Sequence, residues 1–126
     1  LIGALVAADA VISPLAPNGY ALQGITDLQE TILMVQQHFN PALRNLGLLP
    51  NMVSARSSSH ARMLRELRDV IGEKLLGVSV GQRVAIADAV DEGRPVWRAT
   101  KGESALLAGR EMRAACVRIL DAVFAA

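Results

Sequence analysis

The chain has 126 residues, of which 52% are hydrophobic and 20% charged, with a formal net charge of +1 and a single cysteine. This length fits one domain rather than two, and a lone cysteine excludes an internal disulfide. No apolar run approaches the ~20 residues that a membrane-spanning helix needs, so a membrane protein is not expected.

The first third of the chain predicts a helix end, a strand and a second helix. Residues 1–8 are apolar and have neither a methionine start nor a helix cap, so we expect the end of a helix from a longer protein. The apolar run at residues 11–15 ends beside a proline turn and predicts a buried strand. Apolar residues then recur at spacings of three and four, which predicts an amphipathic helix over residues 21–38. Its expected core stripe is Leu22, Ile25, Leu28, Ile32 and Val35.

The middle of the chain predicts a second strand followed by a capped helix. Residues 46–53 form an apolar run that is interrupted by a proline. Three serines at residues 57–59 offer side-chain oxygens that can cap a helix over residues 59–71. We expect His60, at the start of this helix, to be a surface residue.

The last part of the chain predicts a third strand at residues 75–80, a short helix at 84–92 and a final helix over 103–124. Because single helices separate the three strands, they should be adjacent and parallel. The aliphatic composition suits a sheet that helices bury on both faces. The predicted fold is therefore α/β, with a parallel sheet flanked by helices on both faces.

No catalytic or metal-binding motif is complete in this chain. It lacks both the Gly-x-x-x-x-Gly-Lys-Ser/Thr phosphate loop and the Gly-x-Gly-x-x-Gly pattern. Neither His38 nor His60 has a cysteine or carboxylate nearby at a spacing typical of metal ligands. Cys116 lies on the apolar side of the final helix, where a small core side chain is expected.

The loops that leave the strands are the candidate site, because ligands bind at the C-terminal edge of an open parallel sheet. The side-chain amide of Asn51 is placed to meet a base edge, and Gly81 permits close approach of a ligand to the backbone. Two plainer interpretations are equally open: Asn51 caps a turn, and Gly81 supplies a positive φ.

Four segments, in order along the chain, resemble ParA-type partition ATPases. Residues 4–14 (Ala-Leu-Val-Ala-Ala-Asp-Ala-Val-Ile-Ser-Pro) resemble the family segment after the Walker B strand. Residues 20–25 (Tyr-Ala-Leu-Gln-Gly-Ile) resemble its next helix start, and residues 46–56 its following strand and loop. Residues 86–96, with Ile-Ala-Asp-Ala and Gly-Arg-Pro-Val, resemble a fourth element. MinD and the nitrogenase iron protein belong to the same P-loop NTPase-like group.

The resemblance implies that residues 1–126 are the C-terminal part of one ATPase domain whose phosphate-binding half lies upstream. Such a protein binds ATP and Mg²⁺, forms a homodimer on ATP, binds nonspecific DNA and works with a centromere-binding ParB-type partner. It segregates plasmids or chromosomes in the bacterial cytoplasm, on the nucleoid. The chain alone would then hold no catalytic residue or metal ligand and would be inactive.

The resemblance also implies the positions of the base pocket. The residues are Asn51, Met52, Gly81, Gln82 and Arg83. Two positions depart from the family pattern, which usually has proline at 81 and often aspartate where Ser54 stands. A glycine at 81 should leave the loop less rigid.

A DNA surface is expected from the resemblance together with the charge distribution, since twelve of the thirteen basic residues lie within residues 56–126. The candidate phosphate contacts are Arg62, Arg65, Arg98, Lys101, Arg110 and Arg113. They can form one cluster if the helix at 59–71 and the final helix pack on the same face of the sheet. Alternatively, Glu66, Asp69 and Glu111 neutralise these arginines in ordinary surface pairs.

Two other functions remain open. One is a different nucleotide-binding enzyme of the same group, such as MinD or a cobyrinate-type synthetase. MinD requires a basic amphipathic C-terminal helix, and residues 119–126 contain no lysine or arginine. The other is a non-catalytic fragment that acts only through interaction.

Overall fold

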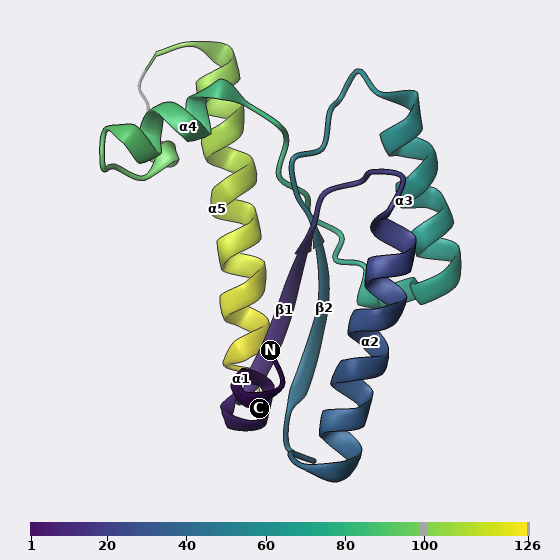
Figure 1. Ribbon diagram of the computed structural model, residues 1–126. Coiled ribbons are helices and arrows are strands. Elements are labelled where there is room, and N and C mark those ends of the chain that lie inside the picture. The colour runs from purple at the N-terminus through teal and green to yellow at the C-terminus, as the bar shows by residue number, and fades with distance from the viewer. Residues whose placement is uncertain (99–100, 126) are drawn as a thin grey trace.

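The computed structural model describes residues 1–98 and 101–125. In chain order its elements are α1 (Ile2–Ala7), β1 (Ala10–Leu15), α2 (Ala21–His38), β2 (Arg44–Pro50), α3 (Ser58–Ile71), the 3₁₀ helix η1 (Gly72–Lys74), α4 (Val84–Asp91), the 3₁₀ helix η2 (Val96–Arg98) and α5 (Glu103–Val123). Figure 1 shows the two strands between α2 and α3 on one side and α5 on the other. No helix within the described residues combines the length and the apolar character needed to cross a membrane.

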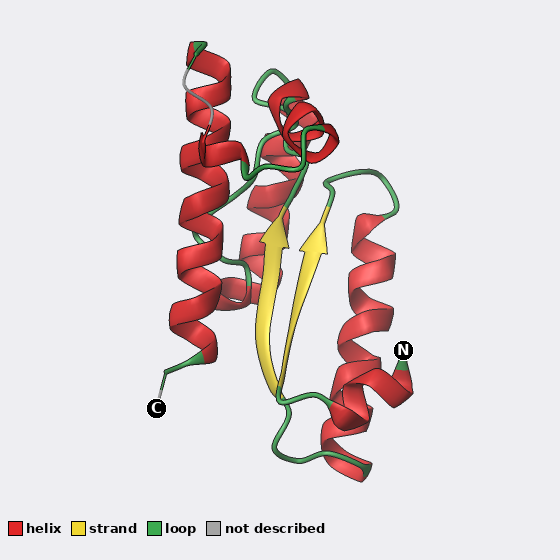
Figure 2. Cartoon of the chain, turned by 90° about the vertical axis from the view of Figure 1, so that its left-hand side faces the viewer, coloured by secondary structure: helices red, strands yellow, loops and turns green. Residues whose placement is uncertain are grey.

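The two strands are parallel, as predicted, and both arrows in Figure 2 point the same way. Val11 pairs with Asn45 and Ile12 with Gly47, so Leu46 is an extra residue in β2. Gly47 takes up this irregularity with a φ of +103°. The sequence predicted this strand at residues 46–53. The observed β2 begins two residues earlier and ends three residues earlier.

The predicted third strand at residues 75–80 is not a regular strand. The segment runs parallel to β2 and is joined to it by a single bridge between Leu75 and Leu48, and a second bridge beyond the strand joins Gly81 to Val53. The carbonyl oxygens of Leu48 and Pro50 accept hydrogen bonds from its backbone. The N–H and C=O of an extended residue point to the same side, so the N–H of position 50 would also face this segment. Proline has no N–H, and the ladder is interrupted there.

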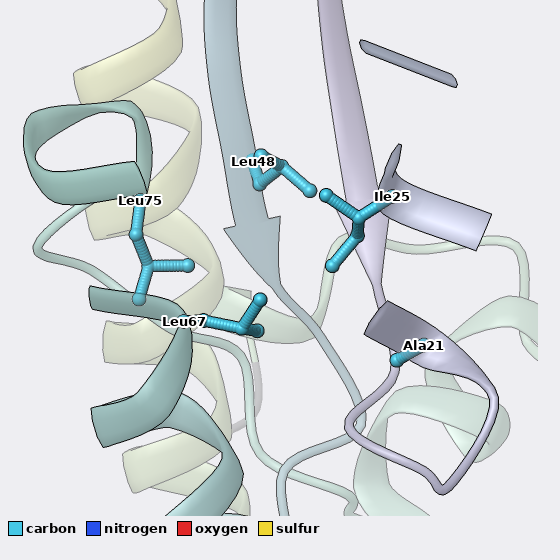
Figure 3. Packing of buried hydrophobic residues seen from close by; sticks show 5 residues of the cluster. All are labelled: Ala21, Ile25, Leu48, Leu67 and Leu75. Atoms are coloured by element: carbon cyan, nitrogen blue, oxygen red, sulfur yellow. The ribbon is translucent and has the colours of Figure 1, made fainter. Parts of the chain in front are cut away.

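Alternate residues of β2 place the core on both sides of the sheet. Leu48 packs against α2, α3 and the segment after η1, in the cluster shown in Figure 3: Ala21, Ile25, Leu48, Leu67 and Leu75. Leu49 instead packs with Leu76, Val80 and Ala115 of α5. Successive strand residues point to opposite faces, so α2 and α3 cover one face and α5 the other. This confirms the predicted fold class, a parallel sheet with helices on both faces.

The core stripe predicted for α2 is correct except at its first residue. Ile25, Ile32 and Val35 are buried and Leu28 is partly buried. Leu22 is 39% exposed, because it lies at the edge of an open groove of about 290 Å³ between α2 and α3 rather than beneath them.

Helix α5 is fixed at both ends by long-range contacts. Near its start, a Cβ on Gly109 would lie 2.8 Å from Trp97 Cα, so glycine permits close packing of η2 on the helix. Near its end, Arg44 at the start of β2 donates to the carbonyl oxygens of Ala122 and Val123. A guanidinium at this position satisfies carbonyls that have no partner within the helix.

Candidate functional site

Three loops lie at the C-terminal edge of the sheet, and backbone hydrogen bonds join the second of them to the end of β1 and to the third. They comprise residues 16–20, 51–57 and 81–83. Asn51 N donates to Leu15 O at 2.8 Å, which ties the second loop to the end of β1. Val53 N donates to Val80 O at 3.1 Å and Gln82 N donates to Val53 O at 3.0 Å. The structure therefore brings together the two loops that carry all five residues proposed to contact a base.

Asn51 and Met52 form a sharp turn directly after β2. Met52 has a φ of +52° and its side chain is 51% exposed. A non-glycine residue in this left-handed region costs about 1–2 kcal/mol, and such strain concentrates at binding sites. Asn51 is half-buried, and no hydrogen bond joins its side-chain amide to another residue of 1–98 or 101–125. Within that part of the chain its donor and acceptor are free for a ligand.

His60 ties the second loop to α3 and is half-buried rather than the surface residue expected from the sequence. Its Nδ1 accepts a hydrogen bond from Ser54 N at 2.9 Å. Its own N–H donates to Ser57 Oγ at 3.1 Å, the helix cap that the serine cluster predicted. The N–H of Ser54 needs an acceptor once the loop folds back, which is why the imidazole turns inward.

Gly81 is buried, and the reason for a glycine there is space rather than backbone conformation. Its φ is not positive, which excludes the interpretation that glycine is needed for a left-handed turn. A Cβ at this position would lie 3.0 Å from Glu111 Oε1 and 3.1 Å from Arg83 Nε. These two side chains form an ion pair at 2.7 Å directly over the glycine.

The six proposed phosphate contacts are divided between two surfaces. Arg62 and Arg65 are exposed on α3, which packs on the face of the sheet that Leu48 contacts. Arg110 and Arg113 are exposed on α5, which covers the opposite face. The condition for a single cluster, both helices on one face, is not met.

On α5 a basic groove runs along the exposed side of the helix, and we define it by Trp97, Arg110, Arg113 and Arg118. Arg110 and Arg113 line both a cavity of about 160 Å³ beside Trp97 and a neighbouring one of about 500 Å³ that includes Arg118. Arg98 and Lys101, both exposed, adjoin the Trp97 end in sequence. Arg118 was not predicted, although it follows Arg110 by eight residues, which is about two helical turns.

Glu66, Asp69 and Glu111 form no ion pair with these arginines among the described residues. Within residues 1–98 and 101–125 the ion pairs are Arg83 with Glu111 and Arg94 with Glu92. Glu111 therefore faces the third loop rather than the groove. The groove keeps a net positive charge, because Asp121 is the one acidic residue that lines its described cavities.

Comparison with known proteins gives a consistent set of relatives. Residues 4–96 match the family model described as "CobQ/CobB/MinD/ParA nucleotide binding domain". The chain is 41% identical to protein IncC of Escherichia coli over 114 residues, which is 90% of the chain and 31% of IncC. It is 34% identical to the chromosome partitioning protein ParA of Myxococcus xanthus over 115 residues, 88% of the chain and 41% of that protein.

Among solved structures, the chain resembles cobyrinic acid a,c-diamide synthase from Mycobacterium smegmatis with bound ATP analogue and magnesium. The TM-score is 0.59 at 28% identity, covering 93% of the chain and 41% of the synthase. The same enzyme with bound ADP and magnesium gives the same score and identity. The chain thus spans between 31% and 41% of the length of these relatives.

Proposed function

Because this chain belongs to the CobQ/CobB/MinD/ParA family of nucleotide-binding domains, we propose that it is the C-terminal part of an ATP-hydrolysing partition protein. In this proposal the protein dimerises on ATP, binds DNA without sequence preference and segregates a plasmid or chromosome. Its partner is a centromere-binding protein of ParB type, and its place is the bacterial cytoplasm, on the nucleoid. Similarity to a chromosome partitioning protein over 88% of the chain supports this choice within the family.

The observation that carries the proposal is the convergence of the Asn51 and Gly81–Arg83 loops within the segment that matches the family model. An amide side chain presents one donor side and one acceptor side, the pattern that the edge of adenine requires. Asn51 has both free among the described residues, at the edge of a parallel sheet where such folds bind ligands. Met52 and Gln82, both exposed, provide further surface for the base.

The rest of the ATP site is proposed to lie in a preceding half of the same domain. The chain covers only part of its relatives' length. Within the described residues, β1 pairs on one side only, with β2, so its other edge is available to a further strand. The preceding half would hold the phosphate-binding loop and the catalytic residues, leaving this chain inactive alone.

The part of the chain that the structure describes holds no cluster of side chains suited to Mg²⁺. No three His, Cys, Asp or Glu side chains lie together within residues 1–98 and 101–125. We therefore assign Mg²⁺ no ligand here and no step that involves the residues of this chain. ATP hydrolysis depends mainly on positioning and electrostatics around the phosphates, and this chain would contribute by fixing the base.

A second candidate is a small-molecule synthetase, which the likeness to cobyrinic acid a,c-diamide synthase favours. Such an enzyme has no need of a surface for a polyanion. Binding of the ATP-loaded protein to DNA of random sequence would separate the two, as the partition protein should bind and the synthetase should not. A third possibility, a non-catalytic fragment that acts only through interaction, is distinguished by measuring ATP binding, which such a protein should lack.

Replacing Asn51 by alanine should weaken ATP binding by roughly 1–2 kcal/mol, the scale of one hydrogen bond lost from a desolvated site. Titration calorimetry of ATP with the full-length protein measures the change. The matched control is Gln37→Ala, which removes an exposed amide near the end of α2 and should leave ATP affinity as it is. Equal affinity in wild type and Asn51→Ala would remove Asn51 from the base pocket.

A further inference from the structure

The third loop of the candidate site is held to α5 by one ion pair. Arg83 Nε donates to Glu111 Oε1 at 2.7 Å, across 28 residues of sequence. The two side chains are 18% and 24% exposed, so solvent and salt screen their attraction less than that of a surface pair. A charge-assisted hydrogen bond at this depth is among the stronger side-chain contacts of a protein.

Gly81 and this ion pair occupy the same small volume. An alanine at 81 would bring its Cβ within 3.0 Å of Glu111 Oε1 and force the carboxylate to shift by a few tenths of an ångström. Glycine at 81 therefore leaves room for the pair that lies over it. The pair in turn restrains a loop whose glycine would otherwise leave it free.

The loop is thus fixed from two sides. On one side Gln82 N donates to Val53 O at 3.0 Å, which links the loop to the Asn51 turn. On the other side Arg83, immediately before α4, is anchored to the middle of α5. Removing the second link would leave the Gly81–Arg83 loop, within the described residues, without its side-chain tie to α5, while the backbone bond from Gln82 to Val53 stays in place.

We propose that Arg83 and Glu111 are positioning residues, which hold the Gly81–Arg83 loop in the conformation that receives the nucleotide base. This inference rests on the proposed function. It gives Arg83 a positioning role through its Nε, which Glu111 engages. A loop held in place before binding loses less conformational entropy when the ligand arrives, and affinity rises accordingly.

The test compares ATP with inorganic tripolyphosphate, which carries the phosphates without the base. In the full-length protein, Glu111→Gln should weaken ATP binding roughly tenfold, the size of one charge-assisted contact, and leave tripolyphosphate binding unchanged. A variant that merely folds less well binds both ligands more weakly by the same factor, since apparent affinity scales with the competent fraction. The ratio of the two affinities therefore isolates the loop.

The control variant is Glu92→Gln, which breaks the more exposed pair with Arg94 and should leave the ratio at its wild-type value. Gly81→Ala should shift the ratio in the same direction as Glu111→Gln. If Glu111→Gln binds ATP and its ratio of ATP affinity to tripolyphosphate affinity equals that of the wild type, the inference is wrong. The proposed function is not affected by that result. If the wild-type protein binds ATP no more tightly than tripolyphosphate, the adenosine contributes no affinity. That result overturns the base pocket, and this inference with it.

Discussion

Replacing Gly47 by alanine is expected to lower the free energy of unfolding by roughly 2–6 kcal/mol, from backbone strain and overpacking together. Gly47 has a φ of +103°, which side chains rarely tolerate. Its added Cβ would lie 2.2 Å from the backbone oxygen of Lys74. Because that neighbour is main chain, relief requires moving η1 and the 75–80 segment that leads to the third loop.

The measurement is chemical denaturation of the full-length protein, and Gly24→Ala is the matched control. Gly24 lies inside α2, and a Cβ there meets no atom within 4 Å. The same substitution should therefore stabilise the protein by about 0.5–1 kcal/mol. Opposite signs at the two glycines are expected. A Gly47→Ala protein as stable as wild type would mean that β2 and η1 do not pack as described.

Reversing two charges in the basic groove, Arg110→Glu with Arg113→Glu, should reduce the DNA affinity of the ATP-loaded protein by about a hundredfold or more. Both arginines are exposed, unpaired within the described residues and line the same two cavities. Contacts to phosphate are sensitive to salt, and each one lost lowers the salt slope by about one unit. The slope should therefore fall by at least about two units.

The two-sided arrangement of the basic residues supplies the control for this prediction. Arg62→Glu with Arg65→Glu reverses the same charge on α3, on the opposite face of the sheet. If the groove on α5 is the DNA surface, this second pair should change affinity far less. A larger loss of DNA affinity in the α3 variant than in the α5 variant would mean that the DNA surface lies on α3. ATP binding, measured on each variant, shows whether the fold survives.

The helices could be predicted closely because their signals are local. Periodicity and proline limits gave α2 as residues 21–38, as found, and serine caps placed the start of α3 within one residue. The order of the elements also predicted the parallel sheet and helices on both faces. The family resemblance, read from four short segments, is confirmed by the family match over residues 4–96.

What could not be predicted depends on contacts between distant residues. The 75–80 segment pairs irregularly with β2, where Pro50, a residue in another element, has no N–H to donate. The Arg83–Glu111 pair joins positions 28 residues apart. The division of the basic residues between α3 and α5 depends on which face of the sheet each helix covers. The periodicity within a helix does not indicate that face.

The central claim is that the edge formed by the Asn51 and Gly81–Arg83 loops holds the base of ATP. Photolabelling of the full-length protein with an azido-adenine analogue of ATP, followed by peptide mapping, tests it directly. The label should be found in the peptides that contain Asn51–Met52 or Gly81–Arg83, and excess ATP should prevent it. ATP-protected label found only in other peptides would contradict the claim.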